Sequence, residues 1–446
     1  MYAFLKILCR LTLLGYFKRI KISGREHLKE DGPYIFVANH PSAFMDPIAV
    51  ATSIKQTVYF LAAGEYMGKG LKFKFMNKVL HMIPIYRPST MPGDTHKNKA
   101  IFSKCTEHLL RKRCLLVFPE GVSVTERKIL PLKTGVARIA RTTELEADFK
   151  AKVKIVPVGL NYSDPHTFRS DLFINIGKPI HAKDFFSKSE EKEMIQEEVK
   201  ALTNHIEEKM IDSILHHEEA EMEFLMERLN ASYSNELHEE LNIDFSDQEA
   251  AFKLDKLTID AIKHFKIEDE SAYKNMKEQV KSYVHLLKNQ GIKDRDLTKY
   301  QTPYSAVQIL YLIIGLPFFT LGYLGNFIPF IINDRIQKMI NNQDSFQGSL
   351  KMGIGLFIFL LYYIALVIVL WMLTPLGFIS LLIPFILYLS GTYALIYRKV
   401  FNVIKRRMNL KKTFKEQPHL ASDILQERDL LYAKLQAFRK AYDNRA

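Results

Sequence analysis

The amino-acid sequence predicts an α/β domain with a mostly parallel sheet, followed by a charged helical segment and a C-terminal membrane region with several spans. Three observations carry this prediction. Residues 24–186 alternate short β-rich runs with helical stretches, as parallel sheets require. Residues 187–302 are rich in charged residues and contain one glycine and no proline. Residues 303–398 contain two long uncharged stretches, each exceeding the roughly 20 residues that one spanning helix needs.

The composition points to an anionic partner. The chain has 446 residues, a formal net charge of +13 and 48% hydrophobic residues, enough for a substantial core. Nucleic acid, a membrane surface and an acidic substrate would all suit this charge. The uncharged stretches favour the membrane, because basic residues beside them attract anionic lipid. We therefore expect membrane lipid as a partner and no nucleic acid.

Residues 1–23 are predicted to form an amphipathic, membrane-associated helix. Apolar residues recur there at helical spacing with basic residues among them, and the apolar set is Phe4, Ile7, Leu8, Leu11 and Leu14. The same pattern suits an ordinary helix docked on the next domain, and the two interpretations are compatible. Lys6 and Arg10 interrupt the apolar run and no small-residue cleavage site follows, so we expect this segment to be retained.

Five β-rich runs predict the strands of the α/β domain at residues 24–186. They are PYIFVANH, TVYFLAA, CLLVFPEG, VKIVPVGLNY and LFINIGKPI, and helical segments such as NKAIFSKCTEHLLRKR separate them. Polar clusters follow the ends of several runs. Since open α/β sheets place their active sites at the carboxyl ends of strands, the chemistry is expected there.

The segment at 187–302 has helical periodicity and shows no internal repeat. Within it, Ser246, Asp247 and Gln248 follow one another in an order typical of a helix start. No recognisable chemistry is found in this segment.

The membrane region at 303–398 contains two uncharged stretches. The second, 352–397, is long enough for two crossings, with a natural turn at Thr374–Gly377. The first, 303–333, is interrupted by glycine and proline, which leaves a broken pair of helices or a re-entrant hairpin.

Basic residues set the expected topology. Lys351 precedes the second stretch, and Arg398 and Lys399 follow it, so both of its ends are expected on the cytoplasmic side. With a cytoplasmic catalytic domain, the stretch 303–333 then crosses an even number of times or not at all. The tail at 399–446 is basic and amphipathic, and it is expected to lie as a helix along the cytoplasmic surface.

The strongest local signal is the segment from Asn39 to Asp46, NHPSAFMD, directly after the run PYIFVA. A histidine titrates near neutrality and can take a proton from a hydroxyl, and a carboxylate can hold its other ring nitrogen in the required tautomer. His40 and Asp46 are therefore a candidate general base and its partner. Taken alone, such a pair is more often a helix cap and a surface residue.

Two further clusters carry weaker signals. Ile83–Arg87 ends in an arginine, which can bind phosphate oxygens bidentately, and Phe118–Gly121 ends in a glycine, which lets the backbone approach an anion. Taken singly, a surface salt bridge and a simple turn explain them.

Together these segments resemble the glycerol-phosphate and 1-acylglycerol-phosphate acyltransferase superfamily, whose blocks read NHxxxxD, a G-x-x-F/I-x-R type segment, FPEG, and V-P-V. The corresponding blocks are Asn39–Asp46, Ile83–Arg87, Phe118–Gly121 and Ile155–Val158, in the family's order. The resemblance covers about residues 24–182. It implies that His40 and Asp46 are the catalytic pair and that Arg87, Glu120 and Gly121 line the acceptor-phosphate site.

Two departures from the family blocks bear on the acceptor. Five residues separate His40 from Asp46, where the common block has four. The longer spacing is similar to a subset that includes fungal glycerol-3-phosphate and dihydroxyacetone-phosphate acyltransferases, which also carry C-terminal membrane segments. FPEG continues as Val-Ser where many members have Thr-Arg, so Arg87, and Lys133 in PLKTG, are expected to supply positive charge. Glu120 is expected to orient one of these two.

The implied function is transfer of a fatty acyl group from an acyl thioester to a hydroxyl of 1-acyl-glycerol-3-phosphate or glycerol-3-phosphate in phospholipid biosynthesis. His40 would deprotonate the hydroxyl, which attacks the thioester without a covalent enzyme intermediate. The donor is acyl-CoA or acyl carrier protein, and no cofactor is expected. The alternative is a membrane lipid-binding scaffold or a transporter, although the long apolar stretches contain no Asp, Glu, Lys or Arg.

Hydrolase and metal chemistry are disfavoured. Gly121–Thr125 lacks the final glycine of a G-x-S-x-G elbow, and neither His216–Glu218 nor His238–Glu240 completes H-E-x-x-H. The three cysteines, Cys9, Cys105 and Cys114, are scattered, which predicts a reduced compartment and no thiol-ligated metal.

Overall fold

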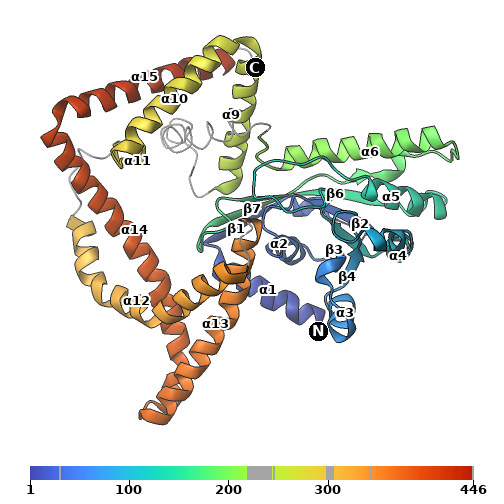
Figure 1. Cartoon of the computed structure of the whole chain (residues 1–446), viewed down its shortest axis with the longest axis horizontal. Coiled ribbons are helices and arrows are strands. Elements are labelled where there is room, and N and C mark those ends of the chain that lie inside the picture. The colour runs from blue at the N-terminus through green and yellow to red at the C-terminus, as the bar shows by residue number, and fades with distance from the viewer. Residues whose placement is uncertain (30–31, 218–243, 245–246, 298–305, 341–343, 444–446) are drawn as a thin grey trace. The chain divides into compact units, whose positions relative to one another are not determined.

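A mostly parallel sheet of eight strands forms the centre of the N-terminal half of the computed structural model (Figure 1). The structure describes residues 1–29, 32–217, 244, 247–297, 306–340 and 344–443. The strand order is β1-β7-β6-β2-β5-β3-β4, and β8 pairs with β6. Only β7 and β8 run antiparallel to a neighbour, β6, among the pairings of the described residues. The strands are β1 (Arg19–Ser23), β2 (Tyr34–Ala38), β3 (Val58–Ala63), β4 (Met82–Ile85), β5 (Cys114–Val117), β6 (Lys154–Tyr162), β7 (Asp171–Ile176) and β8 (Ile180–His181).

The sheet confirms the predicted fold class, and each of the five β-rich runs contains a strand. Three strands were not predicted separately, and one of them, the short β8, begins at the last residue of the fifth run. Strand β4 lies at the Ile83–Arg87 cluster, and β1 lies where residues 1–23 were predicted to be helical. Helix α1 (Tyr2–Tyr16) ends early because the sequence that follows alternates charged and apolar residues with the period of a strand. The helix prediction is therefore wrong at its C-terminal end.

Helices cover both faces of the sheet. Strand β2 is completely buried, and its alternate residues enter different layers: Phe36 joins the core on one face, whereas Ile35 and Val37 join the core on the other. The first core includes residues of α1 and α2, and the second includes residues of α4, α5 and α6. The remaining helices of this region are α2 (Met45–Ser53), α3 (Gly70–Lys78), α4 (Asn98–Leu110), α5 (Gly135–Glu146) and α6 (Lys192–Ser213).

Helix α1 docks on the sheet domain through one face and exposes another. Leu13 and Tyr16 are buried, and Lys6 Nζ donates to the Ile54 carbonyl at 2.8 Å, which places a cation at the C-terminal end of α2. Five other apolar side chains of α1 are 40 to 69% exposed, namely Phe4, Ile7, Leu8, Leu11 and Leu14. Docking is thus confirmed, and membrane association of the exposed face stays a prediction.

The chain divides into two compact units whose bounds differ from the predicted domains. The first unit contains Met1–His216 and Gln337–Ile354, and the second contains His217–Ile336 and Gly355–Ala446. The first unit extends past the predicted end at residue 186 because the apolar stripe of α6 joins the core of the sheet domain. The first residues of a C-terminal helix also belong to this unit.

The second unit is helical. It contains α9 (Gln248–Glu268), α10 (Glu270–Asn289), α11 (Asp294–Leu297), most of α12 (Ala306–Ile340) and of α13 (Asp344–Leu373), α14 (Ile383–Glu416) and α15 (Pro418–Asp443). The predicted helix start is confirmed at Gln248, and the cap is Asp247, whose carboxylate accepts from the amides of Glu249 and Ala250; Ser246 lies outside the described residues. Buried Asp296 pairs with Arg406 at 2.7 Å, so part of the basic tail has a structural role.

Three helical segments are long and apolar enough to cross a membrane: Ala306–Ile340, Asp344–Leu373 and Gly377–Glu416. Helices α13 and α14 form the predicted pair, joined by the turn that begins at Thr374. Helix α14 continues without a break through the basic residues that follow the apolar stretch.

Helix α12 follows a bent path against this pair (Figure 1). Asn326, in its middle, binds both members: it donates to the Leu387 carbonyl at 2.9 Å and accepts from Tyr363 at 2.6 Å. The part of α12 before Asn326 contacts α14 farther from the turn, where the Tyr397 hydroxyl donates to the Leu312 carbonyl. The part after Asn326 contacts α13 farther from the turn, where Asn333 lies beside Gly355. The helix therefore approaches the middle of the pair and turns back. It contains Pro317 and Pro329, which remove backbone hydrogen bonds and permit bending. A broken pair is thus wrong, because α12 is one continuous helix, and the re-entrant alternative stays a prediction.

Candidate active site

Four neighbouring parallel strands end at one edge of the sheet and carry most of the predicted site residues. His40 follows β2, Glu120 follows β5, and Arg87 follows β4. Strand β3 lies between β5 and β4 and is followed by Glu65, which the sequence analysis did not single out. Because these strands are parallel, their carboxyl ends meet at the same edge.

His40 and Asp46 form a direct pair. His40 Nδ1 lies 2.8 Å from Asp46 Oδ2, and the aspartate side chain is completely buried while the histidine is 21% exposed. The carboxylate therefore holds the proton on Nδ1 and leaves Nε2 as the basic nitrogen. Among the described residues, no group hydrogen-bonds Nε2. The ring of Phe118 stacks on the imidazole at a centroid distance of 4.1 Å and fixes its plane.

Three donors converge on the Asp46 carboxylate. Oδ2 accepts from His40 and from the Ser42 amide at 2.7 Å, and Oδ1 accepts from the Tyr162 hydroxyl at 2.8 Å. Burial raises the pKa of Asp46, and these hydrogen bonds oppose the rise. Burial also raises the pKa of Tyr162, which keeps its hydroxyl a donor. Tyr162 was missed because it lies 116 residues from Asp46 in sequence.

The longer loop between His40 and Asp46 has a strained residue and a specific support. Ala43 has a φ of 37°, in the left-handed region that non-glycine residues rarely adopt. Ser123 Oγ accepts from the Ala43 amide at 3.0 Å and donates to the His40 carbonyl at 2.8 Å. The Val-Ser sequence after FPEG, where many family members have Thr-Arg, thus supplies a hydroxyl that holds the longer loop. This contact also argues against Ser123 as a nucleophile, because its hydroxyl binds backbone groups.

The FPEG segment forms a tight turn. The Gly121 amide donates to the Phe118 carbonyl at 3.1 Å, and Gly121 has a φ of 76°, which favours glycine. Glu120 is only 6% exposed; its Oε2 accepts from the Leu130 amide at 3.0 Å, and its buried Oε1 has no hydrogen-bond partner in the described part of the chain. Desolvation raises the pKa of Glu120 to about 7. This carboxyl can therefore exist in both protonation states near neutral pH.

Arg87 is oriented by a residue other than the predicted one. One guanidinium nitrogen donates to the Gly121 carbonyl at 2.8 Å, and another pairs with Glu65, whose second oxygen accepts from Thr90 at 2.9 Å. Burial alone would raise the pKa of Glu65, but the hydrogen bonds from Thr90 and Arg87 outweigh it and lower that pKa. The expectation that Glu120 orients Arg87 or Lys133 is wrong, because the Glu120 carboxylate binds the Leu130 amide instead. The position of Glu65 directly after a strand-like run could have indicated it.

Lys133 lies beside the FPEG turn. Its amide donates to the Pro119 carbonyl at 2.9 Å, and its side-chain stem is near Gly121. The side chain is exposed, and no carboxylate pairs with it within the described ranges. Lys133 therefore offers a cation at the edge of the site.

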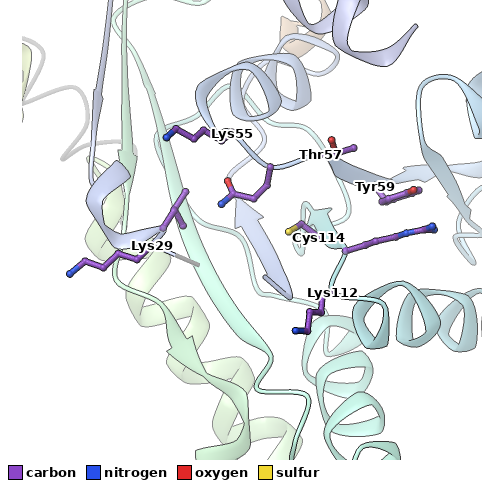
Figure 2. A pocket seen from close by; sticks show the side chains of 9 residues that line it. Lys29, Lys55, Thr57, Tyr59, Lys112 and Cys114 are labelled. Atoms are coloured by element: carbon purple, nitrogen blue, oxygen red, sulfur yellow. The ribbon is translucent and has the colours of Figure 1, made fainter. Parts of the chain in front are cut away.

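Other sequence candidates lie elsewhere. His216 Nδ1 accepts from the Ile129 amide at 3.1 Å, which is a structural role, while Glu218 and His238–Glu240 lie outside the described residues. A cavity of about 490 Å³ opens at the amino ends of β3 and β5, away from the edge that holds His40 (Figure 2). It is lined by Leu28, Lys29, Lys55, Gln56, Thr57, Tyr59, Lys112, Arg113 and Cys114 and contains no predicted site residue.

Comparison with known proteins covers the region that builds this site. The acyltransferase family model matches residues 19–161. Glycerol-3-phosphate O-acyltransferase 1 from Saccharomyces cerevisiae is 35% identical over 130 residues, which are 28% of this chain and 17% of that protein. Glycerol-3-phosphate O-acyltransferase 2 from the same yeast is 30% identical over 145 residues, 32% of this chain and 17% of that protein. The crystal structure of the 1-acyl-sn-glycerophosphate (LPA) acyltransferase PlsC from Thermotoga maritima is 22% identical with a TM-score of 0.32, over 46% of this chain and 77% of that chain.

The His40–Asp46 pair, the FPEG turn and strands β1 to β5 thus lie in the region that matches the acyltransferase family model, whereas β7 and β8 lie outside it. Over residues 19–161 the chain is similar to acyltransferases, and two of these relatives are glycerol-3-phosphate acyltransferases of yeast. The matched regions span about a sixth of the length of the two yeast relatives.

Proposed function

We propose that this chain transfers a fatty acyl group from an acyl thioester to a hydroxyl of glycerol-3-phosphate, a step of phospholipid biosynthesis. The observation that carries the proposal is the His40–Asp46 pair, in which a buried carboxylate fixes the tautomer of an imidazole whose Nε2 is available. The names of both yeast relatives support glycerol-3-phosphate as the acceptor. Its 1-acyl derivative is the competing acceptor.

In this mechanism, His40 Nε2 removes the proton of the acceptor hydroxyl as that oxygen attacks the thioester carbonyl carbon. Asp46 accepts the Nδ1 hydrogen bond and stabilises the imidazolium that forms. The tetrahedral intermediate then collapses: the new ester bond remains, the carbon–sulfur bond breaks, and the leaving thiolate takes the proton back from His40. No side chain is acylated, which agrees with the backbone hydrogen bonds that hold Ser123.

Lys133 and Arg87 bind the acceptor phosphate in this proposal. Lys133 is exposed beside the FPEG turn, so its charge is available to an anion. Arg87 is already paired with Glu65, and a phosphate that carries more negative charge than one carboxylate can compete for its guanidinium. Glu120 is close to half protonated near pH 7, and its neutral form repels a phosphate less than its anion does.

The acyl donor is acyl-CoA or acyl carrier protein, and no further cofactor takes part. The exposed apolar face of α1 and the apolar helices α13 and α14 keep the domain at a membrane, where the acylated product belongs. We assign the domain to the cytoplasmic side, because Arg398 and Lys399 directly follow the apolar part of α14.

The test is an acceptor screen with the purified full chain in lipid nanodiscs and radiolabelled acyl-CoA. Glycerol-3-phosphate, dihydroxyacetone phosphate and 1-acylglycerol-3-phosphate are compared at equal concentration. The proposal is supported if glycerol-3-phosphate gives the highest kcat/KM. If 1-acylglycerol-3-phosphate gives the highest kcat/KM, that compound is the acceptor instead. No transfer from acyl-CoA or acyl carrier protein to any acceptor by folded protein would favour the lipid-binding scaffold.

A further inference from the structure

The start of helix α13 is built into the catalytic unit. Residues 344–354, here called the docking segment, group with the sheet domain although they lead into the longest apolar stretch of the chain. Met352 is 5% exposed and joins the core that contains α1 and α2. Lys351 Nζ donates to the His166 carbonyl at 2.6 Å, and the ring of Phe346 packs edge-on against Phe44, in the loop before Asp46, at 5.5 Å.

Within the docking segment, Ser349 reaches the catalytic loop directly. Its hydroxyl accepts from the Met45 amide at 3.0 Å and donates to the Ser42 carbonyl, and the residue is 5% exposed. The Met45 amide also donates to the Ser42 carbonyl at 2.9 Å, so Ser349 closes a turn that leads into α2. The residue after Met45 is Asp46, in the first turn of α2, and the Ser42 amide binds the Asp46 carboxylate.

The helix and the loop approach each other closely at Gly348. A Cβ atom at this position would collide with the Pro165 carbonyl and would lie 3.2 Å from Ser42 Oγ. Only glycine allows the helix to come near enough for the neighbouring hydroxyl to bind the loop. The contact therefore depends on backbone proximity as well as on the serine.

We propose that Ser349 is a positioning residue for the His40–Asp46 pair, so that the first turns of a membrane helix form part of the active site. This inference rests on the proposed function for its catalytic meaning. The loop needs support because it is one residue longer than the family block and contains Ala43 in a left-handed conformation. Ser123 holds the half of the loop next to His40, and Ser349 holds the half next to Asp46.

This arrangement couples catalysis to the membrane anchor. Ser349 lies three residues before the uncharged stretch that begins at Met352, so the loop is tied to the helix at its entry into the apolar region. A displacement of α13 would move the loop and change the position of Asp46 relative to His40. Since a misplacement of about 1 Å can cost roughly 100-fold in rate, loss of this contact should affect turnover more than substrate binding.

The experiment compares four variants of the full chain in nanodiscs: Ser349→Ala, Ser349→Thr, Gly348→Ala and the matched control Ser345→Ala. Ser345 is also 5% exposed and lies one turn earlier on the same helix, and no hydrogen bond joins it to the loop within the described residues. Ser349→Ala should lower kcat roughly 10- to 100-fold with KM values within about threefold. Gly348→Ala should do the same, Ser349→Thr should recover part of the rate, and Ser345→Ala should resemble the wild type.

Hydrogen–deuterium exchange of the peptide that covers residues 40–46 gives a readout that needs no turnover. Loss of the Ser349 hydrogen bonds should increase its exchange rate about tenfold, with little change for Ser345→Ala. Normal kcat and unchanged exchange in Ser349→Ala would overturn the inference, as would an equal effect of Ser345→Ala. If the wild type shows no acyl transfer, the proposed function fails. The exchange of residues 40–46 then still tests the contact: an increase in Ser349→Ala shows that Ser349 holds the loop, and no change shows that it does not.

Discussion

The buried carboxyl of Glu120 makes a specific prediction about stability and pH. Desolvation raises its pKa to about 7 from the ordinary value of 4.5. Between these two pH values the folded protein keeps a proton that the unfolded chain has released, so the unfolded state binds fewer protons and stability falls as pH rises. The fall begins near pH 4.5, is complete above about pH 7, and does not reverse at higher pH.

The size of this effect follows from the same values. A shift of roughly 2.5 pKa units corresponds to about 3 kcal/mol of destabilisation at pH 8, at about 1.4 kcal/mol per unit. Glu120→Gln mimics the protonated form and should remove the pH dependence. Because 1 kcal/mol shifts the Tm of a domain of this size by roughly 2–4 °C, the variant should melt about 6–12 °C higher than the wild type at pH 8 and only about 2–3 °C higher at pH 5.

The assay is thermal unfolding followed with a thiol-reactive fluorophore, because Cys105 and Cys114 are buried in the acyltransferase domain and report its opening. Wild type and variant are compared at each pH from 5 to 8.5, in a background where Cys9 is replaced by Ser. The control is Glu126→Gln, an exposed glutamate of the same loop, which should give no pH-dependent difference. A difference between Glu120→Gln and wild type that is constant across this range would refute the reasoning.

Two further predictions concern the acceptor and the topology. Arg87→Ala should raise KM for the phosphorylated acceptor roughly 10-fold to a few hundred-fold and leave KM for the acyl donor almost unchanged. Arg87→Lys should recover part of the lost acceptor binding. An increase confined to KM for the acyl donor would place Arg87 on the thioester side of the site. Because α12 turns back at the middle of the α13–α14 pair, a cysteine introduced at Asn342 should react with an impermeant reagent on the cytoplasmic side, and one introduced at Pro375, in the turn, on the opposite side. Labelling of both from one side would contradict this topology.

Local sequence patterns predicted the parts of the fold that depend on local rules. The fully buried strand β2 appears as the apolar run that precedes Asn39, and the polar clusters after the β-rich runs predicted that the site lies at the carboxyl ends of the strands. The turn at Thr374 was predicted because proline and glycine interrupt a stretch too long for one helix. The same rule misjudged α12, where Pro317 and Pro329 bend a continuous helix without ending it.

Contacts between distant residues set the limit of prediction for the site. The partners of Asp46 include Tyr162, and the catalytic loop is held by Ser349, which lies 304 residues from Met45. No periodicity or spacing brings such pairs together, because their proximity follows from the packing of complete elements. The role of Glu120 was misassigned for a related reason: its partner is a backbone amide, that of Leu130, and backbone partners leave no residue-type signal.

The central claim is that His40 is the general base of an acyl transfer, and its direct test is the turnover of His40→Ala. The control is His181→Ala. His181 is an exposed histidine of the same domain and lies in β8, opposite Lys154 at the start of β6. His40→Ala should lower kcat by roughly 10²- to 10⁴-fold with unchanged Tm, whereas His181→Ala should keep wild-type turnover. Asp46→Asn should also lower kcat, because the amide does not stabilise the imidazolium. A folded His40→Ala variant with turnover near that of the wild type would contradict the account.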